Sequence, residues 1–227
     1  MTRRRLTRPE RSAQTRAELM ASARQLFLRR GFHASSLEQV AEEAGFTIGA
    51  VYSRFGSKAA LFLAILDEQI DQLVAEVAQV AALDQPLGDH AELLAGRRMA
   101  LLEREGEWFP PVLEFWSHAA RDERLRPEFG ARHERLVGAY AGLIEADYAR
   151  LGLTLPLAPE VLARAVVAMG NGVALERLTD PARVPDGLLS TMAMAFLRGV
   201  AADEPAAERR SRRTEVLTWH SPTEPGG

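Results

Sequence analysis

The chain has 227 residues, of which 47% are hydrophobic and 26% charged, with a net charge of −3. This balance is typical of a globular protein and excludes a disordered or fibrous one. The absence of cysteine excludes a disulfide scaffold, a thiolate zinc site, an iron–sulfur cluster and a cysteine nucleophile. No apolar run is long enough to span a membrane, and no apolar segment follows the N-terminal arginines as in a secretory signal. We therefore expect a cytoplasmic protein without membrane association.

Residue usage predicts an all-α fold, and charge indicates a partner. The chain holds 37 Ala and 30 Leu against 4 Ile and 14 Val, so good helix formers dominate and β-branched residues are scarce. Residues 1–58 carry 11 basic and 5 acidic side chains, a net +6, whereas the remainder carries −9. A basic end on an acidic body indicates that the first quarter of the chain meets a polyanion. The alternative is a solvated basic tail.

The first part of the chain is predicted to be a basic arm followed by a helix-turn-helix domain. Residues 1–11 have no hydrophobic periodicity and are expected to form a flexible arm. A helix then begins at Ser12 or Thr15 and ends at Gly31. Three helices follow, with hydroxyl caps and, for the first two, terminal glycines: Ser36 and Gly45, Thr47 and Gly56, and Ser57. Helix, short glycine-containing turn and helix indicate a helix-turn-helix domain over residues 12–58.

The remainder is predicted to be a larger helical domain, residues 59–202, followed by a polar, disordered tail, residues 203–227. Proline and glycine breaks divide this domain into helices expected at 90–105, 108–121, 122–151, 159–178 and 185–201. Asp122 is expected to cap one of these helices, and Pro159 and Pro185 to open two others.

The window from Thr15 to Leu66 holds several motifs in register. AxxLFxxxGF is matched from Ala23 to Phe32, and S/T-x-x-x-[IV]-A-x-x-A-G-[VF] from Ser36 to Phe46. T-x-G-x-[VLI]-Y-x-x-F then runs from Thr47 to Phe55, and S-K-x-x-L from Ser57 to Leu61. This combination resembles the DNA-binding domain of the tetracycline-repressor (TetR) family. The later helices resemble the regulatory domain of that family in number, length and order, and residues 170–189 resemble its dimerisation segment.

The resemblance implies that double-stranded operator DNA is a partner, with the recognition helix in the major groove. Helix N-termini favour phosphates, and Arg can grip guanine in a bidentate way. The residues expected to contact DNA are Arg3, Arg4, Arg5, Ser36, Thr47, Ile48, Gly49, Tyr52, Ser53, Arg54 and Lys58. Arg54 is the first candidate for a base contact, whereas Val51 and Phe55 are expected in the core. The alternatives are Thr47 as a cap only, Tyr52 as a half-buried structural ring, Arg54 as a solvated side chain, and a floppy arm.

The resemblance further implies a pocket for an unidentified small-molecule effector in the larger domain. The residues expected to bind it are Met99, Trp108, Phe115, Trp116, His118 and Tyr140. Aromatic residues at helical spacing are also typical of a core, which is the alternative for each of them. The effector class stays open, with an apolar or aromatic compound favoured.

Two C-terminal helices carry small and apolar residues on broad faces, which allow close helix packing. The residues expected to form a homodimer interface are Val166, Val167, Gly170, Val173, Met192 and Phe196. A homodimer is favoured because a palindromic operator needs two recognition helices about 34 Å apart. The alternative is a core within one chain.

Enzyme and metal motifs are missing from the sequence. HERLV at 133–137 begins like a zinc-protease motif, but Val137 stands where the second His would be, and GxSxG, P-loop and GxGxxG patterns are absent. We expect no catalytic residue, metal or cofactor. The sequence thus predicts a ligand-responsive homodimeric transcriptional regulator, a repressor released from a palindromic operator by a small molecule, with activation left open. The alternative is a helical ligand-binding or catalytic protein without sequence-specific DNA readout.

Overall fold

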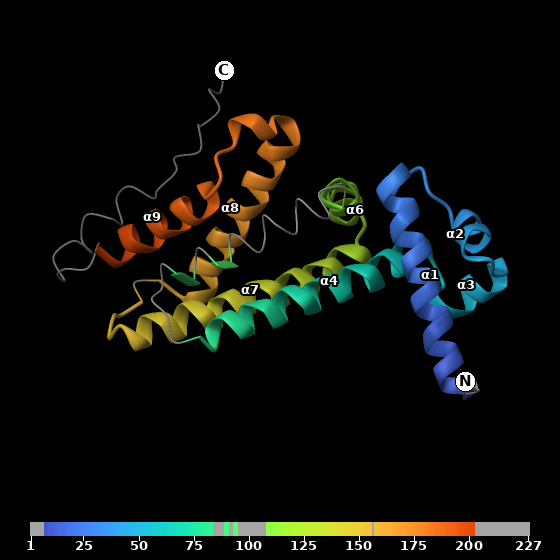
Figure 1. The fold of residues 1–227 in the computed structure, drawn as a ribbon, viewed down its shortest axis with the longest axis horizontal. Helices are drawn as coiled ribbons and strands as arrows, with labels where there is room; N and C mark the ends of the chain where they lie inside the picture. Colours follow the sequence, from blue (N-terminus) through green and yellow to red (C-terminus); the bar gives the residue numbers. More distant parts are fainter. Residues whose placement is uncertain (1–6, 84–88, 91–92, 95–107, 156, 203–227) are drawn as a thin grey trace, which may run out of the picture.

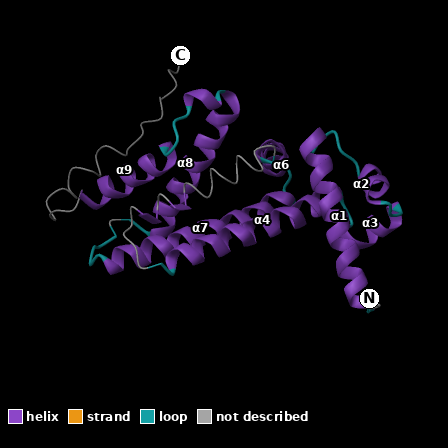
Figure 2. Cartoon of the chain, in the orientation of Figure 1, coloured by secondary structure: helices purple, strands orange, loops and turns teal. Residues whose placement is uncertain are grey.

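The described part of the chain is entirely helical, as expected. The computed structural model describes residues 7–83, 89–90, 93–94, 108–155 and 157–202, and Figures 1 and 2 show only helices and loops there. Three helices lie at one end: α1 (Arg8–Arg30), α2 (Leu37–Ala44) and α3 (Ile48–Phe55). None of the described helices is long and apolar enough to cross a membrane.

Helix α1 begins earlier than the sequence analysis expects, so the prediction of an arm over residues 1–11 is wrong for residues 8–11. Thr7 caps the helix: its Oγ1 accepts the Glu10 backbone N–H at 3.4 Å, and the Glu10 carboxylate accepts the Thr7 N–H at 2.7 Å. This reciprocal capping box satisfies two backbone donors and tolerates Pro9 in the first turn. The predicted caps Ser12 and Thr15 therefore lie inside α1.

The turns of the three-helix domain follow the predicted capping residues. Ser36 and Gln39 form a capping box at the start of α2, and Gly45 ends it in the left-handed conformation at φ 71°. The hydroxyls of Thr47 and Ser57 accept the N–H groups of Ala50 and Ala60, which begins α3 and α4 (Lys58–Ala81). These local signals hold α2 and α3 at a short turn, the arrangement of a helix-turn-helix unit.

The larger domain consists of long helices packed along α4. Helix α6 (Phe109–Arg121) is seen end-on in Figure 1, and α7 (Leu125–Arg150) runs alongside α4. Helices α8 (Pro159–Thr179) and α9 (Leu188–Ala202), joined by the short 3-10 helix η1 (Pro181–Arg183), complete the domain. The predicted helix at 90–105 lies mostly outside the described residues, as does the tail at 203–227.

One predicted helix start is wrong by about one turn, and one predicted capping residue makes the bonds expected of it. Asp122 accepts the N–H groups of Arg124 and Leu125 at 2.8 and 3.1 Å through its carboxylate, and its carbonyl accepts the N–H of Arg126, although the regular helix α7 begins only at Leu125. Pro185 lies in the turn before α9, where Gly187 takes φ 75°, and the helix starts at Leu188. The start of α8 at Pro159 is confirmed.

One hydrophobic core joins the three-helix domain to the larger one. The Phe62 ring of α4 stacks on Phe115 and Trp108 with centroids 4.4 and 5.2 Å apart, and Phe27 of α1 lies 5.4 Å from Phe62. These residues are buried in a single cluster that spans α1 to α4, α6 and the start of α7. A second cluster packs α7 against α8 and α9. Because the first core is continuous, a displacement of α6 is felt in the three-helix domain.

Candidate DNA-binding surface and effector cavity

Helix α3 buries one face and exposes the other. Val51 and Phe55 are buried, as expected of core residues. The predicted contact residues Thr47, Ile48, Gly49, Tyr52 and Ser53 are exposed. Half of the Tyr52 surface is exposed, so its ring is not a buried structural element. Five of the residues expected to contact DNA therefore lie on the exposed side of α3 or at its cap, Thr47.

Two of the residues expected to contact DNA, Ser36 and Arg54, are partly buried and already hydrogen-bonded within the chain. The Ser36 hydroxyl serves as the cap of α2, and the side chain is half-buried. Arg54 is also half-buried: its Nη1 donates to the Ala50 carbonyl at 3.2 Å, one turn back along the same helix. In this conformation Arg54 lies against α3, so a bidentate base contact requires it to swing outward.

Lys58 makes structural contacts that compete with its predicted contact to DNA. Its Nζ donates to the carbonyls of Phe32 and Ser35, each at 2.7 Å, and of His33 at 3.3 Å. The ammonium also lies 4.4 Å from the centroid of the Phe32 ring. Burial lowers the pKa of Lys58 below its usual value, and the Glu114 carboxylate opposes that shift. Lys58 thus fastens the α1–α2 turn to the start of α4.

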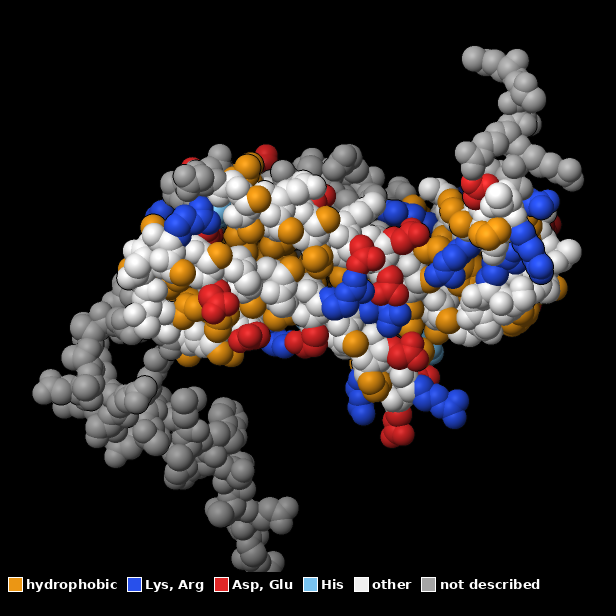
Figure 3. Space-filling model, turned by 90° about the horizontal axis from the view of Figure 1, so that it is seen from below, with side chains coloured by type: hydrophobic (Ala, Val, Ile, Leu, Met, Phe, Trp, Pro, Cys, Tyr) orange, Lys and Arg blue, Asp and Glu red, His pale blue; other side chains and the backbone are white. Residues whose placement is uncertain are grey.

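The basic surface of α1 was missed by the sequence analysis. Arg8, Arg11 and Arg16 are exposed on this helix, and the Arg16 guanidinium lies 4.7 Å over the Phe55 ring of α3. Figure 3 shows Lys and Arg side chains gathered over the three-helix end of the molecule. Arg3, Arg4 and Arg5 lie outside the described residues. A Thr-x-x-Glu capping signal at residues 7–10 was the available sign that part of the arm is helical.

A cavity of about 120 Å³ lies among α4, α6, α7 and α8. Of the residues predicted to bind a ligand, Trp108 and Trp116 line it. The other lining residues, which the sequence analysis did not assign to the pocket, are Leu66, Gln69, Ile70, Leu73, Phe109, Val112, Phe129, His133, Leu136, Val167 and Asn171. They come from four helices far apart in sequence, so no local pattern identifies them.

Three of the predicted pocket residues lie elsewhere, and Met99 lies outside the described residues. Phe115 is fully buried against Phe62, in the core. His118 packs on Phe32, with centroids 5.5 Å apart. Tyr140 lines a second, smaller cavity of about 50 Å³ among α7, α8 and α9. Phe115 and His118 are therefore corrected from ligand contacts to residues that join α6 to the three-helix domain.

Two of the residues around the larger cavity carry polar ring groups, His133 and Trp108. Burial and then the nearby Arg164 charge lower the pKa of His133, against the opposing effect of Glu134, which favours the neutral form of the ring. The His133 ring lies 5.4 Å from that of Trp116. The buried indole N–H of Trp108 has no hydrogen-bond partner within the described part of the chain.

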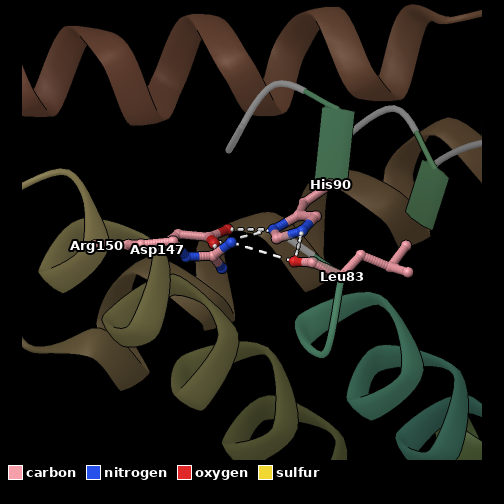
Figure 4. A network of polar contacts seen from close by, with 4 residues as sticks. All are labelled: Leu83, His90, Asp147 and Arg150. Atoms are coloured by element: carbon pink, nitrogen blue, oxygen red, sulfur yellow. Dashed lines mark hydrogen bonds and ion pairs between the residues drawn. The ribbon is translucent and has the colours of Figure 1, made fainter. Parts of the chain in front are cut away.

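A buried charge network borders the smaller cavity. His90 Nδ1 lies 2.9 Å from both oxygens of Asp147, and its Nε2 lies 3.2 Å from the Leu83 carbonyl. Arg150 donates to Asp147 at 2.6 Å and to the Leu83 carbonyl at 3.1 Å (Figure 4). His90 and Asp147 are almost completely buried. The network fastens the end of α4 and the His90 segment to α7.

Glu114 connects the cavity helix to the three-helix domain. Its Oε2 accepts the backbone N–H of His33 at 3.1 Å, in the turn between α1 and α2. Gly31, in the same turn, approaches this carboxylate so closely that a side chain there would meet it. Trp108, Val112 and Trp116 surround the cavity from the same segment as Glu114. Helix α6 therefore touches both the cavity and the helix-turn-helix unit.

Several predicted dimer residues are covered within the chain itself. Val167, Gly170 and Val173 are buried, and Val166 and Phe196 are half-buried, in contacts among α7, α8 and α9. The prediction that Val167, Gly170 and Val173 are open to a second copy is thus wrong. Met192 is exposed. The exposed small and apolar residues of these two helices are Val161, Ala168, Gly172, Leu175, Leu178, Met192, Ala195 and Gly199.

Comparisons with known proteins agree with the fold and its two parts. Residues 19–65 match the family described as "Bacterial regulatory proteins, tetR family", and residues 103–202 match "BetI-type transcriptional repressor, C-terminal". The HTH-type transcriptional activator FasR of Mycolicibacterium smegmatis is 39% identical over 75 residues, which are 33% of this chain and 32% of FasR. The chain thus aligns with about a third of the length of that relative.

Solved structures extend the likeness to most of the chain. GusR of Salmonella enterica superimposes with a TM-score of 0.71 at 20% identity, covering 88% of this chain and all of GusR. FadR of Bacillus subtilis, solved in complex with stearoyl-CoA, superimposes with a TM-score of 0.66 at 12% identity, covering 83% and 99%. At such identities the likeness establishes the fold alone. With both family matches and the helix-turn-helix geometry, this chain belongs to the TetR family of transcriptional regulators.

Proposed function

We propose that the chain is a homodimeric repressor that reads a palindromic operator and is released by a small molecule in the cavity of α4, α6, α7 and α8. The exposed side of α3, with Tyr52 at its centre, enters the major groove. The arginines of α1 hold the phosphates beside it. Lys58 is left out of this interface because its ammonium binds three carbonyls.

The position of α6 is the strongest support for ligand control. This helix lines the cavity through Trp116 and Val112, and Glu114 between them binds the α1–α2 turn through His33. A ligand that fits one position of α6 better than another shifts the balance between two settings of the helix-turn-helix units. FadR, a protein of the same fold, binds stearoyl-CoA, which supports a ligand in this domain.

Dimerisation is assigned to the exposed faces of α8 and α9. Ala168, Gly172 and Leu175 follow one another at helical spacing on α8, as do Met192, Ala195 and Gly199 on α9. Small residues allow close helix approach, and Leu175 and Met192 add apolar area that is otherwise in contact with water.

Replacing Leu175 with arginine is expected to turn a dimer into a monomer, since a charge would be buried without a partner in the interface. Sedimentation measures the mass. Leu151→Arg is the control, because Leu151 is similarly exposed but follows the end of α7 and does not belong to the exposed faces of α8 and α9. Equal mass for both variants and the wild type would place the interface elsewhere.

Operator reading is tested by fluorescence anisotropy with a duplex from upstream of the gene and a scrambled duplex, at two salt concentrations. The wild type is expected to prefer the native duplex at both. Tyr52→Ala is expected to remove about 1–3 kcal/mol of this preference, because the exposed ring lies on the reading face. Its thermal unfolding should be unchanged. Arg54→Ala tests whether the folded-back guanidinium swings out to a base.

A second function, a helical ligand-binding or catalytic protein without DNA readout, predicts a different result. Binding would then be equal for both duplexes, would vanish at the higher salt concentration and would be insensitive to Tyr52→Ala, because charge alone would carry it. A preference for the native duplex with increased transcription in a reporter assay would replace repression by activation.

A further inference from the structure

We propose that Ile48, the first residue of α3, contacts the C5-methyl group of a thymine in each half-site of the operator, and that Gly49 leaves room for the DNA beside it. This inference rests on the proposed reading of an operator by α3 and adds the chemistry by which the bases are distinguished. Three features of α3 carry it: its polar side chains bind their own helix, an apolar side chain is exposed at its start, and a glycine stands where the fold does not require one.

The polar side chains around the exposed side of α3 form hydrogen bonds within the helix. The Ser53 hydroxyl donates to the Ala50 carbonyl at 3.1 Å, and Arg54 Nη1 donates to the same carbonyl at 3.2 Å. The Thr47 hydroxyl accepts the Ala50 N–H at 3.3 Å as the helix cap. Bidentate readout uses Arg or Lys for guanine and Asn or Gln for adenine. The exposed residues of α3 include none of these types, since Arg54 is half-buried against the helix.

Ile48 is the apolar side chain that α3 presents at its start. It is 36% exposed, and the Tyr52 ring, one turn later on the same face, is 50% exposed. In a helix-turn-helix unit the N-terminal residues of the recognition helix contact the base edges. The apolar group that a base presents in the major groove is the thymine methyl. An isoleucine held at the base edges therefore favours thymine, because a base pair without this methyl leaves the side chain without an apolar partner.

Gly49 is required neither by its backbone conformation nor by packing within the described part of the chain. Gly45 and Gly56 have positive φ angles, whereas Gly49 does not. A Cβ on Gly49 would meet only the Thr47 hydroxyl oxygen, 4.0 Å away. Glycine in a helix is less stable than alanine, so this residue has a cost that the fold does not explain. A close approach of DNA to the backbone beside Ile48 does explain it.

The thymine contact is tested by removing methyl groups from the DNA. Deoxyuridine replaces each thymine of the native upstream duplex in turn, and fluorescence anisotropy measures the affinity of the full-length protein. Loss of the methyl at the thymine of one half-site is expected to weaken binding about four-fold, the value of one buried methyl group, and most other replacements to change it less than about two-fold. If no replacement weakens binding by more than two-fold, the proposal is overturned.

A cycle of two duplexes and two proteins assigns the methyl contact to Ile48. In Ile48→Ala the native and the deoxyuridine duplex are expected to bind equally at the sensitive thymine, because the apolar partner of the methyl is gone. Ser53→Ala is the matched control: Ser53 is also exposed on α3, but its hydroxyl binds Ala50, so the four-fold difference should remain. A difference that persists in Ile48→Ala assigns the methyl to another residue and overturns the proposal.

Gly49→Ala is expected to separate stability from DNA binding. Its midpoint of thermal unfolding should rise by about 2 °C, since alanine favours the helix and the fold has room for a Cβ. Its affinity for the native duplex should fall at least about ten-fold, because the Cβ would stand where the DNA approaches. Gly138→Ala is the matched control on α7, at an exposed glycine with equal room, and should raise the midpoint without changing the affinity. Undiminished affinity of Gly49→Ala overturns the close approach of DNA at this position.

The same duplexes separate this inference from the proposed function. Preference for the native duplex over the scrambled one, with no sensitivity to deoxyuridine, leaves operator reading intact and overturns the thymine contact. Equal binding of the native and scrambled duplexes overturns operator reading, and the thymine contact with it.

Discussion

Replacing Gly31 with alanine is expected to destabilise the protein by about 2–4 kcal/mol and to loosen the link between α6 and the helix-turn-helix unit. Gly31 has φ 76° and ψ 172°, a region that is essentially restricted to glycine and costs other residues about 1–3 kcal/mol. An alanine Cβ would also collide with the Glu114 carboxylate, with Oε2 at 2.8 Å. If Glu114 moves aside, it gives up the His33 N–H, a further loss of about 1 kcal/mol.

Gly45→Ala is the control for a positive-φ glycine that has no carboxylate beside it. Gly45 also has a positive φ, 71°, but its ψ of 28° lies in the left-handed helical region, and a Cβ there meets nothing within 4 Å. We expect a loss of only about 1 kcal/mol. Urea unfolding at one fixed protein concentration measures both variants. Equal losses for Gly31→Ala and Gly45→Ala would show that the contact with Glu114 contributes nothing.

A double variant separates the collision from the strain. In a Glu114→Ala background the Gly31→Ala substitution meets no carboxylate, so its cost should fall to that of the backbone strain alone. The operator affinity of Glu114→Ala with and without bound ligand then reports whether this contact carries the coupling. A ligand response as large as that of the wild type would mean that α6 acts through the Phe62 and Phe115 core instead.

Local signals predicted much of the fold because the interactions behind them are local. Ser36, Thr47 and Ser57 cap their helices within three residues, and Gly45 occupies the turn that needs a positive φ. The start of α1 was misplaced although Thr7 and Glu10 carry the same signal as Ser36 and Gln39. The density of arginines in residues 1–11 favoured an arm, but exposed arginines are compatible with a helix.

The sequence could predict site residues only where they follow one another along a single helix. Trp116 lines the cavity, but the adjacent Phe115 points about 100° away around α6 and enters the core with Phe62. The density of aromatic residues in the sequence does not show which of two adjacent residues faces the cavity and which faces the core. Contacts between residues far apart in the sequence have no local signal at all. Lys58 binds the carbonyl of Phe32, 26 positions earlier, and the His133 ring lies beside that of Trp116 on another helix.

Asp147→Asn is expected to be the most destabilising polar substitution in the larger domain, with a loss of about 3–5 kcal/mol. The carboxylate is 1% exposed and accepts from His90 and Arg150. Both ring nitrogens of His90 face acceptor oxygens, those of Asp147 and of the Leu83 carbonyl. An amide in place of the carboxylate removes the negative charge and turns an NH₂ group towards one of these donors.

Asp67→Asn makes the same chemical change where water can compensate for it. Asp67 pairs with two arginines, Arg132 and Arg135, but its side chain is 34% exposed, so we expect a loss of no more than about 1 kcal/mol. Thermal unfolding at one protein concentration should then rank Asp147→Asn well below Asp67→Asn, although both carboxylates have two cationic or potentially cationic partners. The reverse order would mean that the number of ion pairs, rather than burial, determines their contribution here. If a His90→Leu/Asp147→Leu double variant loses less stability than Asp147→Asn, the cost of Asp147→Asn comes from the buried groups that it leaves unpaired. In the double variant only Arg150 loses its partner, and the Arg150 side chain reaches solvent.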